Sequence, residues 1–186
     1  MIEPAVAGRI RLAAFDVDGV LTDGSLFIAS VAGERVELKR FSSLDGLAVW
    51  LLHAAGIRTA LVSGRSAEAT RLRAAELGIE DVIQDGSGQG NKLAPFEALA
   101  ARRGVKLEEC AYVGDDIPDL PLMRRVRLPV AVANAVPEVK AAAAFVTRAR
   151  GGHGAVREFA ETLLRARGVW DEVVGNYLRD RGDESG

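Results

Sequence analysis

The 186-residue sequence is poor in cysteine, in surplus basic charge and in long apolar runs, and each shortage excludes a class of protein. The single cysteine, Cys110, cannot form an internal disulfide or a cysteine-rich metal site. The 24 basic residues are outnumbered by 26 acidic ones, and this net charge of −2 argues against a nucleic-acid-binding protein. No apolar run reaches the length of a membrane span, and the segment MIEPAVAGRI lacks the features of a signal peptide. We therefore expect a cytoplasmic protein that binds neither nucleic acid nor membrane.

Short apolar segments that end in a polar or glycine turn alternate with helix-like segments along the chain. The predicted strands are Arg9–Asp16, Gly56–Gly64, Glu80–Asp85, Cys110–Asp115 and Leu128–Asn134. The predicted helices are Leu44–Ala55, Ser66–Leu77, Lys92–Arg103, Leu120–Val126, Pro137–Ala144, Ala155–Arg167 and Trp170–Leu178. This alternation predicts an α/β fold, a Rossmann-like parallel sheet with helices on both faces. We expect one domain over residues 1–186, with a C-terminal tail and helices over residues 148–186.

One segment departs from this alternation. Residues 25–41, SLFIASVAGERVELKRF, alternate in polarity around AGE, which predicts a β-hairpin inserted between the first strand and the first long helix. An insert of this length is sufficient for a flap but too short for a separate cap domain.

Polar residues follow several predicted strands. In an open α/β sheet, ligands bind at the carboxyl ends of the strands. The residues expected there are Asp16 and Asp18 after the first strand, Ser63, Gly64 and Arg65 after the second, Asp115 and Asp116 after a later one, and Lys92 at the start of a nearby helix. Groups from four distant parts of the chain are therefore expected to meet at one edge.

These groups suit phosphoryl transfer. Asp16 and Asp115 can bind Mg²⁺, which prefers carboxylates, water and phosphate oxygens. An aspartate carboxylate can also act as a nucleophile and form an aspartyl phosphate. Asp18, two residues on, is in position to act as general acid and then as general base. Ser63 can hydrogen-bond the transferring phosphoryl group, and Lys92 can neutralise its charge.

The set resembles the haloacid dehalogenase-like phosphohydrolases, whose four motifs occur in the same order. The matching segments are DVDGV from Asp16, Ser63 in VSGR, Lys92, and GDDIPD from Gly114 to Asp119. The resemblance implies that Asp16 is the nucleophile and Asp18 the acid/base. It implies that Mg²⁺ is held by Asp16, Asp115 and the backbone carbonyl of Asp18. It further implies that Asp116 acts near the metal and that Asp119 supports the site.

Longer segments are similar to a small capless subfamily that contains 3-deoxy-D-manno-octulosonate 8-phosphate (Kdo 8-phosphate) phosphatase. They are DVDGVLTDG, LVSGRSAE, NKL, AYVGDDIPDLPLM and GGHGAVREF. This resemblance implies hydrolysis of Kdo 8-phosphate to Kdo and phosphate in lipopolysaccharide precursor synthesis. It also implies a homotetramer in which the hairpin and the C-terminal tail close the active site of a neighbouring subunit.

Four residues are candidates for binding the sugar-acid substrate. The resemblance implies that Gly64 and Arg65 face the substrate and that Arg157 lies near its anionic groups. Asp45 has two interpretations, a substrate contact or a cap on the helix that follows. The chain departs from the subfamily at Leu44, where a basic or polar residue is usual, and in a longer loop before Lys92.

Alternative functions remain open at this point. Within the phosphatases, the substrate can be a nine-carbon keto-sugar acid 9-phosphate or another sugar phosphate. In a different class, the fold can serve as a non-catalytic oligomerisation module, like domains fused to sugar-acid cytidylyltransferases. The acidic residues and Lys92 favour catalysis, because a purely structural module does not need them.

Overall fold

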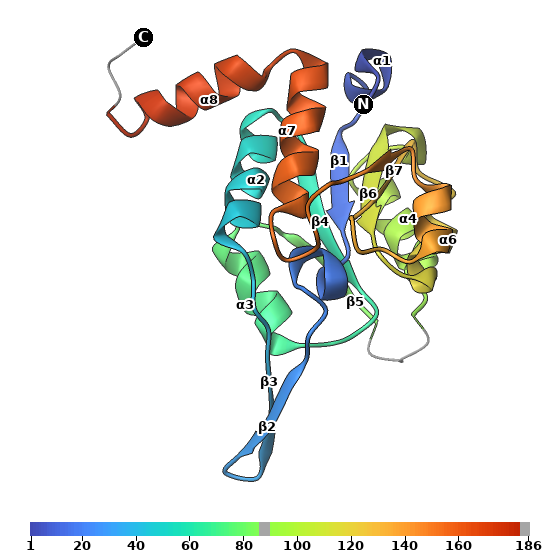
Figure 1. Ribbon diagram of the computed structural model, residues 1–186, viewed down its shortest axis with the longest axis vertical. Coiled ribbons are helices and arrows are strands. Elements are labelled where there is room, and N and C mark those ends of the chain that lie inside the picture. Colours follow the sequence, from blue (N-terminus) through green and yellow to red (C-terminus); the bar gives the residue numbers. More distant parts are fainter. Residues whose placement is uncertain (86–89, 183–186) are drawn as a thin grey trace.

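A six-stranded parallel sheet forms the centre of the protein, as seen in a computed structural model that describes residues 1–85 and 90–182 (Figure 1). The strand order is β5–β4–β1–β6–β7–β8. The strands are β1 (Leu12–Phe15), β4 (Arg58–Ser63), β5 (Asp81–Gln84), β6 (Cys110–Gly114), β7 (Leu128–Ala131) and β8 (Phe145–Val146). Part of the long loop before Lys92 and the end of the predicted C-terminal tail lie outside the described residues.

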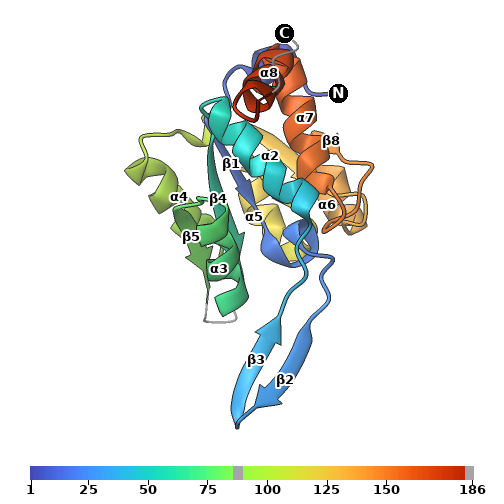
Figure 2. The same cartoon turned by 90° about the vertical axis from the view of Figure 1, so that its left-hand side faces the viewer.

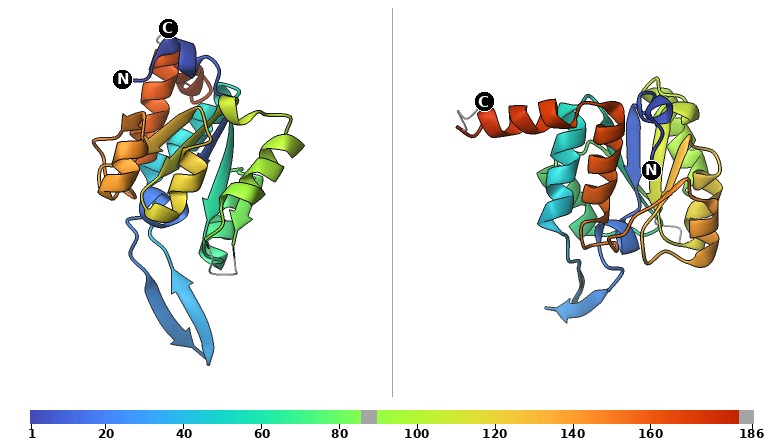
Figure 3. Two further views of the ribbon diagram at one scale, coloured as in Figure 1. Left: turned by 90° about the vertical axis from the view of Figure 1, so that its right-hand side faces the viewer. Right: turned by 45° about the horizontal axis from the view of Figure 1, so that its top comes forward.

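Helices cover both faces of this sheet (Figures 1 and 2). One face carries α2 (Ser43–Ala54), α3 (Glu68–Glu76) and α7 (Ala155–Arg167), and the other carries α4 (Leu93–Arg102), α5 (Leu120–Met123) and α6 (Pro137–Ala142). Four short helical turns are α1 (Pro4–Ala7), η1 (Val17–Leu21), η2 (Leu107–Glu109) and η3 (Ile117–Asp119). The last helix, α8 (Trp170–Arg179), extends sideways from the body (Figure 3). The predicted α/β class, with helices on both faces, is confirmed.

Strand β1 lies at the centre of the sheet because all of its side chains are apolar. Leu12 pairs with Arg58 of β4 on one side and with Cys110 of β6 on the other, and every residue of β1 is buried. Between β1 and α7, the rings of Phe15 and Phe159 meet edge to face with centroids 6.1 Å apart. The chain runs outward from β1 first toward β4 and later toward β6. The strand order thus reverses beside β1, which is where ligands bind in such sheets.

The inserted hairpin consists of β2 (Phe27–Val31) and β3 (Glu34–Leu38) and projects away from the sheet (Figure 2). Its tight turn places Ala32 and Gly33 at φ values of 52° and 85°, as the turn type that suits a two-residue hairpin requires. Several of its apolar side chains are more than half exposed: Phe27, Ile28, Val31 and Leu38. No cap domain is present in the part of the chain that the structure describes.

Strand β8 and helix α1 are among the short elements that were not predicted from the sequence. Strand β8 has only two residues, and α1 only four, so neither shows a readable hydrophobic period. Among residues 1–85 and 90–182, no helix is long and apolar enough to cross a membrane.

Candidate active site

The loop after β1 places Asp16 at the carboxyl edge of the sheet. Its backbone N–H donates to the carbonyl of Val113 in β6 at 3.0 Å, and its side chain is buried. The loop is held by Thr22, whose hydroxyl accepts the N–H of Gly19 at 3.3 Å and donates to the Val17 carbonyl at 3.2 Å. The backbone therefore fixes the position of the Asp16 carboxylate.

Gly19 allows a second aspartate to approach this loop. Its φ is +105°, and a Cβ atom added to it would lie 2.1 Å from Oδ2 of Asp115. A side chain at this position would therefore both strain the backbone and displace the Asp115 carboxylate. This explains in physical terms why a glycine follows the two aspartates of DVDG.

Lys92 lies between two buried carboxylates. Its Nζ is 2.7 Å from Oδ1 of Asp16 and 2.7 Å from Oδ1 of Asp119. Burial disfavours the charged amine, but the two aspartates outweigh burial and raise the pKa of Lys92. The lysine therefore stays protonated and fixes one oxygen of Asp16.

Asp115 remains poorly neutralised beside this lysine. Burial, together with the charges of Asp16 and Asp119, raises the pKa of Asp115 to about 8. Burial and the charge of Asp119 likewise raise the pKa of Asp16 to about 6. The Oδ1 atom of Asp115 is buried and has no hydrogen-bond partner among the described residues. The single ammonium group of Lys92 thus faces three aspartates, and the site has too little positive charge to neutralise them.

Asp119 uses both of its oxygens within the protein. Oδ1 accepts from the Tyr112 hydroxyl at 2.6 Å as well as from Lys92, and Oδ2 accepts the backbone N–H groups of Asp115 at 2.9 Å and Asp116 at 3.2 Å. The Asp116 carboxylate accepts the N–H of Ile117 at 2.8 Å and lies at the surface. Asp119 therefore orients the lysine and the loop that carries Asp115.

These residues fit a hard divalent cation such as Mg²⁺. Carboxylate oxygens of Asp16, Asp115 and Asp119 lie within 4.8 Å of one another. Because the oxygens of Asp119 are already engaged, Asp16 and Asp115 are the better ligands, and the unpartnered Oδ1 of Asp115 is a ready donor. A bound cation would supply the positive charge that this cluster lacks.

A pocket of about 260 Å³ opens over this cluster. Its lining includes Asp16, Asp18, Ser63, Gly64, Arg65, Gly90, Lys92, Asp116, Pro118 and Asp119. Ser63 ends β4, is buried, and accepts the N–H of Arg65 through its hydroxyl at 3.1 Å. The structure thus brings the residues predicted for catalysis and metal binding to one edge of the sheet, with Gly64 and Arg65 at the rim.

Asp18 contacts Lys39, which the sequence analysis did not single out, and Lys39 in turn contacts a second such residue, Glu37. The Asp18 carboxylate forms an ion pair with Lys39, which directly follows β3, and Lys39 lies 3.3 Å from Glu37 of the same hairpin. Glu37 in turn contacts Arg65 at 2.9 Å. The polar alternation in VELKRF was a usable signal, because residues two apart lie on the same face of a strand.

The structure gives Asp45 a role in packing the C-terminal segment. Its carboxylate is buried and accepts the backbone N–H groups of Gly154 at 3.2 Å and Arg157 at 2.9 Å. It does not cap α2, because the side chain of Ser42 does so by accepting the N–H of Leu44. Asp45 therefore ties the start of α7 to the start of α2.

Arg157 lies in a different pocket from the carboxylate cluster. Its guanidinium lies over the ring of Trp170, 5.4 Å from the centroid, and it lines a separate pocket of about 560 Å³ together with Leu44 and His153. Within one chain, the structure does not bring Arg157 to the pocket that contains Asp16. A substrate contact by Arg157 remains a prediction.

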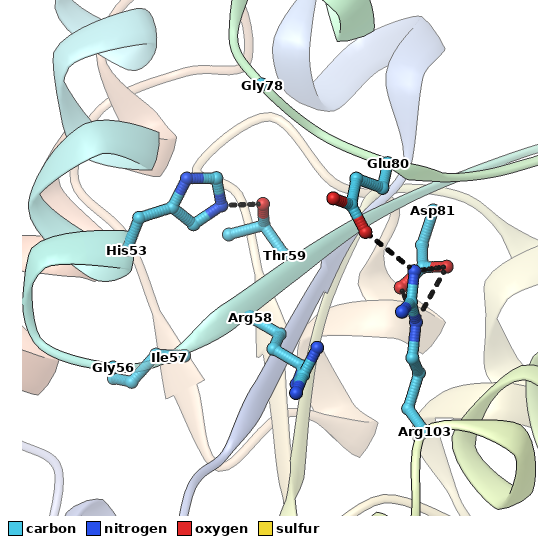
Figure 4. Close-up of a pocket in the computed structure, with 9 residues that line it drawn as sticks. All are labelled: His53, Gly56, Ile57, Arg58, Thr59, Gly78, Glu80, Asp81 and Arg103. Carbon is cyan, nitrogen blue, oxygen red and sulfur yellow. Dashed lines mark hydrogen bonds and ion pairs between the residues drawn. The ribbon is translucent and has the colours of Figure 1, made fainter.

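The opposite edge of the sheet holds another pocket, of about 320 Å³ (Figure 4). There Arg103 contacts Asp81 at 2.8 Å and Glu80 at 3.0 Å, and Nε2 of His53 lies 2.6 Å from the Thr59 hydroxyl. Glu80 lies at the surface, and the buried Asp81 pairs with Arg103 and also lies 3.8 Å from Arg102. This pocket is the larger of the two, but it lacks the excess of buried carboxylates found around Asp16.

Comparison with known proteins agrees with the geometry. Residues 86–159 match the sequence model of a family described as haloacid dehalogenase-like hydrolase. The chain is 44% identical over 174 residues to the 3-deoxy-D-manno-octulosonate 8-phosphate phosphatase KdsC of Escherichia coli K12, covering 94% of this chain and 89% of that protein.

The chain belongs to the KdsC family of haloacid dehalogenase-like hydrolases. Another KdsC relative, from Yersinia pestis, is 40% identical over 169 residues and covers 91% of this chain and 87% of its own.

Solved KdsC-type structures share the fold over nearly the whole chain. The Moraxella catarrhalis enzyme, crystallised with magnesium ion, phosphate ion and KDO, has a TM-score of 0.85 at 37% identity, covering 94% of this chain and 97% of that one. The cobalt-bound form of the Haemophilus influenzae enzyme has a TM-score of 0.82 at 36% identity, covering 92% and 99%. The fold expected for a capless member of this family is therefore confirmed.

Proposed function

We propose that this protein is a Mg²⁺-dependent phosphomonoesterase that hydrolyses Kdo 8-phosphate to Kdo and phosphate in the synthesis of lipopolysaccharide precursors. The observation that carries the proposal is the buried Asp16 carboxylate, held by Lys92 beside the unpartnered oxygen of Asp115 at the base of a pocket. The similarity to KdsC phosphatases over most of the chain supports the choice of substrate.

Mg²⁺ would be held by Asp16, Asp115 and the backbone carbonyl of Asp18. When bound, it would neutralise the negative charge of the phosphate group and of the carboxylates around it. Burial and the neighbouring carboxylates raise the pKa values of Asp16, to about 6, and Asp115, to about 8, and a bound cation would offset both effects.

The reaction itself uses the protein side chains. The Asp16 carboxylate attacks phosphorus, the bond from phosphorus to the sugar oxygen breaks, and the Asp18 carboxyl donates a proton to that oxygen. Water then attacks the aspartyl phosphate and gives a proton to Asp18. This hydrolysis releases phosphate and restores the Asp16 carboxylate. Ser63 and Lys92 bind the phosphoryl oxygens as charge develops.

Substrate selection is assigned to the rim of the pocket. Gly64 lets the substrate approach the backbone, and the Arg65 guanidinium can pair with the carboxylate of the sugar acid. Asp45 instead holds the start of α7 against the start of α2, by accepting the N–H groups of Gly154 and Arg157.

The hairpin over residues 25–41 is proposed to act as a flap between subunits of a cytoplasmic homotetramer. The exposed apolar side chains of Phe27, Ile28, Val31 and Leu38 support this, because a projecting two-stranded hairpin with so much apolar surface favours a partner. In such an assembly the segment over residues 148–186, with Arg157, would help to close a neighbouring site. Gel filtration is expected to give a mass of about four chains.

Phosphate release from a panel of sugar phosphates tests the proposed function. Kdo 8-phosphate is expected to be the best substrate, with turnover lost when Mg²⁺ is removed. Asp16→Asn is expected to lose at least about a thousandfold in kcat because the nucleophile is gone, with its circular dichroism spectrum unchanged. Unchanged turnover in this variant would refute the assignment of Asp16.

The same panel separates the alternatives. Faster turnover of a nine-carbon keto-sugar acid 9-phosphate would move the proposal to that substrate, and Leu44, exposed near the start of α2, is the residue that motivates including it. Release of phosphate from no compound would favour a non-catalytic oligomerisation module.

A further inference from the structure

The root of the hairpin brings a pair of charged residues into the candidate active site. Glu37 lies in β3, and Lys39 directly follows that strand. The two residues are two positions apart, so both side chains lie on the same face. The Lys39 side chain is fully excluded from solvent, and that of Glu37 is 10% exposed. A buried ammonium is unfavourable unless carboxylates surround it, so its position is determined by the acids that it contacts.

Those acids belong to a closed ring of four alternating charges. Lys39 pairs with Oδ1 of Asp18 and lies 3.3 Å from Oε1 of Glu37. Oε2 of Glu37 is 2.9 Å from Nη2 of Arg65, and Nε of Arg65 is 3.8 Å from Oδ2 of Asp18. Within the ring two acids balance two bases, and Arg35 adds a further contact to Oε2 of Glu37 at 3.1 Å from outside it. The ring joins the hairpin to the loops after β1 and β4.

The ring makes the two oxygens of Asp18 unequal. Oδ1 is held by Lys39, whereas Oδ2 is buried, lies too far from Arg65 for a hydrogen bond, and has no hydrogen-bond partner among residues 1–85 and 90–182. Asp18 and Arg65 both line the pocket over Asp16. Oδ2 is thus the oxygen that is free to exchange a proton with a bound substrate.

We propose that Lys39 is a positioning residue that orients the Asp18 carboxylate so that Oδ2 delivers the proton to the leaving oxygen, with Glu37 holding both Lys39 and Arg65 in place. This inference rests on the proposed phosphatase function. It assigns a role in proton delivery to the hairpin of the same chain. No new reaction step is required, because the proton passes from Asp18 to the sugar oxygen as that oxygen leaves phosphorus.

Leaving groups that differ in their need for a proton test this role. A sugar phosphate releases an alkoxide that must be protonated, whereas p-nitrophenyl phosphate releases a stable phenolate that needs no acid. Lys39→Met is expected to lower kcat for the sugar phosphate about thirtyfold but kcat for p-nitrophenyl phosphate less than about threefold. Lys39→Arg, which keeps the charge, is expected to restore most of the loss.

Two further variants make the result specific. Glu37→Gln is expected to show the same selective loss of kcat for the sugar phosphate, but a smaller one. It weakens the ion pair with Lys39 without removing the amine. Arg40→Met is the matched control, since Arg40 is the next residue, is exposed, and pairs with Asp23 outside the ring. It is expected to leave both activities unchanged.

The outcomes separate the inference from the proposed function. An equal loss on both substrates in Lys39→Met, or no loss on either, would overturn the positioning role, because a structural defect does not distinguish leaving groups. A wild-type protein that hydrolyses neither substrate would instead refute the phosphatase function itself. If Lys39→Met does not fold, as judged by circular dichroism, the ratio of the two activities in Glu37→Gln decides.

Discussion

At the amino edge of the sheet Arg103 lies between two carboxylates, as Lys92 does at the carboxyl edge. The Arg103 side chain is 27% exposed and one of its partners, Glu80, is 78% exposed, whereas Lys92 and its partner Asp119 are 6% and 1% exposed. Of these groups at the amino edge only Asp81 is buried, and it pairs with both Arg103 and Arg102, so its charge is balanced, while the other charges are screened by water. At the carboxyl edge burial strengthens every interaction and leaves Asp115 without enough positive charge.

This difference teaches that the balance of buried charge locates the reactive site better than the size of a cavity does. The pocket at the amino edge is about 320 Å³ and the pocket over Asp16 about 260 Å³. Three carboxylates and one lysine at the smaller pocket create a demand for a cation and a phosphate group. The following predictions test this contrast.

Removing the basic residue at each edge should give the largest difference. Lys92→Met is expected to lower kcat at least about a thousandfold, because the variant loses the cation that binds the phosphoryl oxygens. It also leaves Asp16 and Asp119 facing each other without the lysine, so the metal-free protein should be less stable by about 3 kcal/mol. Steady-state kinetics and urea denaturation measure the two effects.

Arg103→Met is the matched control for this prediction. It should keep full activity and lower the urea midpoint far less than Lys92→Met does, because Arg103 and Glu80 are partly exposed and Arg102 still lies 3.8 Å from the buried Asp81. A comparable loss of activity in Arg103→Met would show that the two edges are not functionally distinct.

The pH dependence of stability should show the acid excess at the carboxyl edge. Because the pKa values of Asp16, about 6, and Asp115, about 8, are raised on folding, the folded state binds protons more tightly than the unfolded state. The free energy of unfolding of the metal-free protein should therefore fall as the pH rises from 5 to 8, on the order of 5 kcal/mol. Thermal denaturation in EDTA measures this change.

Asp115→Asn and added Mg²⁺ provide the checks on this second prediction. The variant should flatten the decline, and Mg²⁺ should raise the melting temperature of the wild type most at pH 8, where both carboxylates are ionised. If the variant and the wild type show the same slope between pH 5 and 8, the raised pKa of Asp115 is not the cause.

The amino edge should show a small effect of the opposite sign. Burial lowers the pKa of His53, so the unfolded state takes up a proton more readily and stability is lost as the pH falls below about 6.5. The effect should be small because the residue is exposed. Comparing the melting temperatures of the wild type and His53→Gln from pH 5 to 7 measures this effect. If stability depends more steeply on pH through His53 than through Asp115, the contrast between the two edges is wrong.

Much of the fold was predictable because it depends on local patterns. The run that becomes β1 is apolar on both faces, as a central parallel strand must be, and the alternation of strands and helices predicts the layers. Asp16, Asp18, Ser63, Lys92 and Asp115 could be proposed because each follows a strand or starts a helix at one edge. The two-residue strand β8 could not be predicted, because it forms only by pairing with β7.

The sequence by itself determined the order of the strands and helices along the chain and the residue types at the carboxyl edge, because hydrophobic period and turn residues act over a few positions. Only the tertiary structure decided which distant groups meet. Asp45 accepts N–H groups more than a hundred positions away, and Lys39 reaches Asp18 because β3 returns the chain to the base of the hairpin, beside the loop after β1. The physical reason is that a buried charge takes its place from the partners that surround it, and those partners come together only when the whole chain has folded.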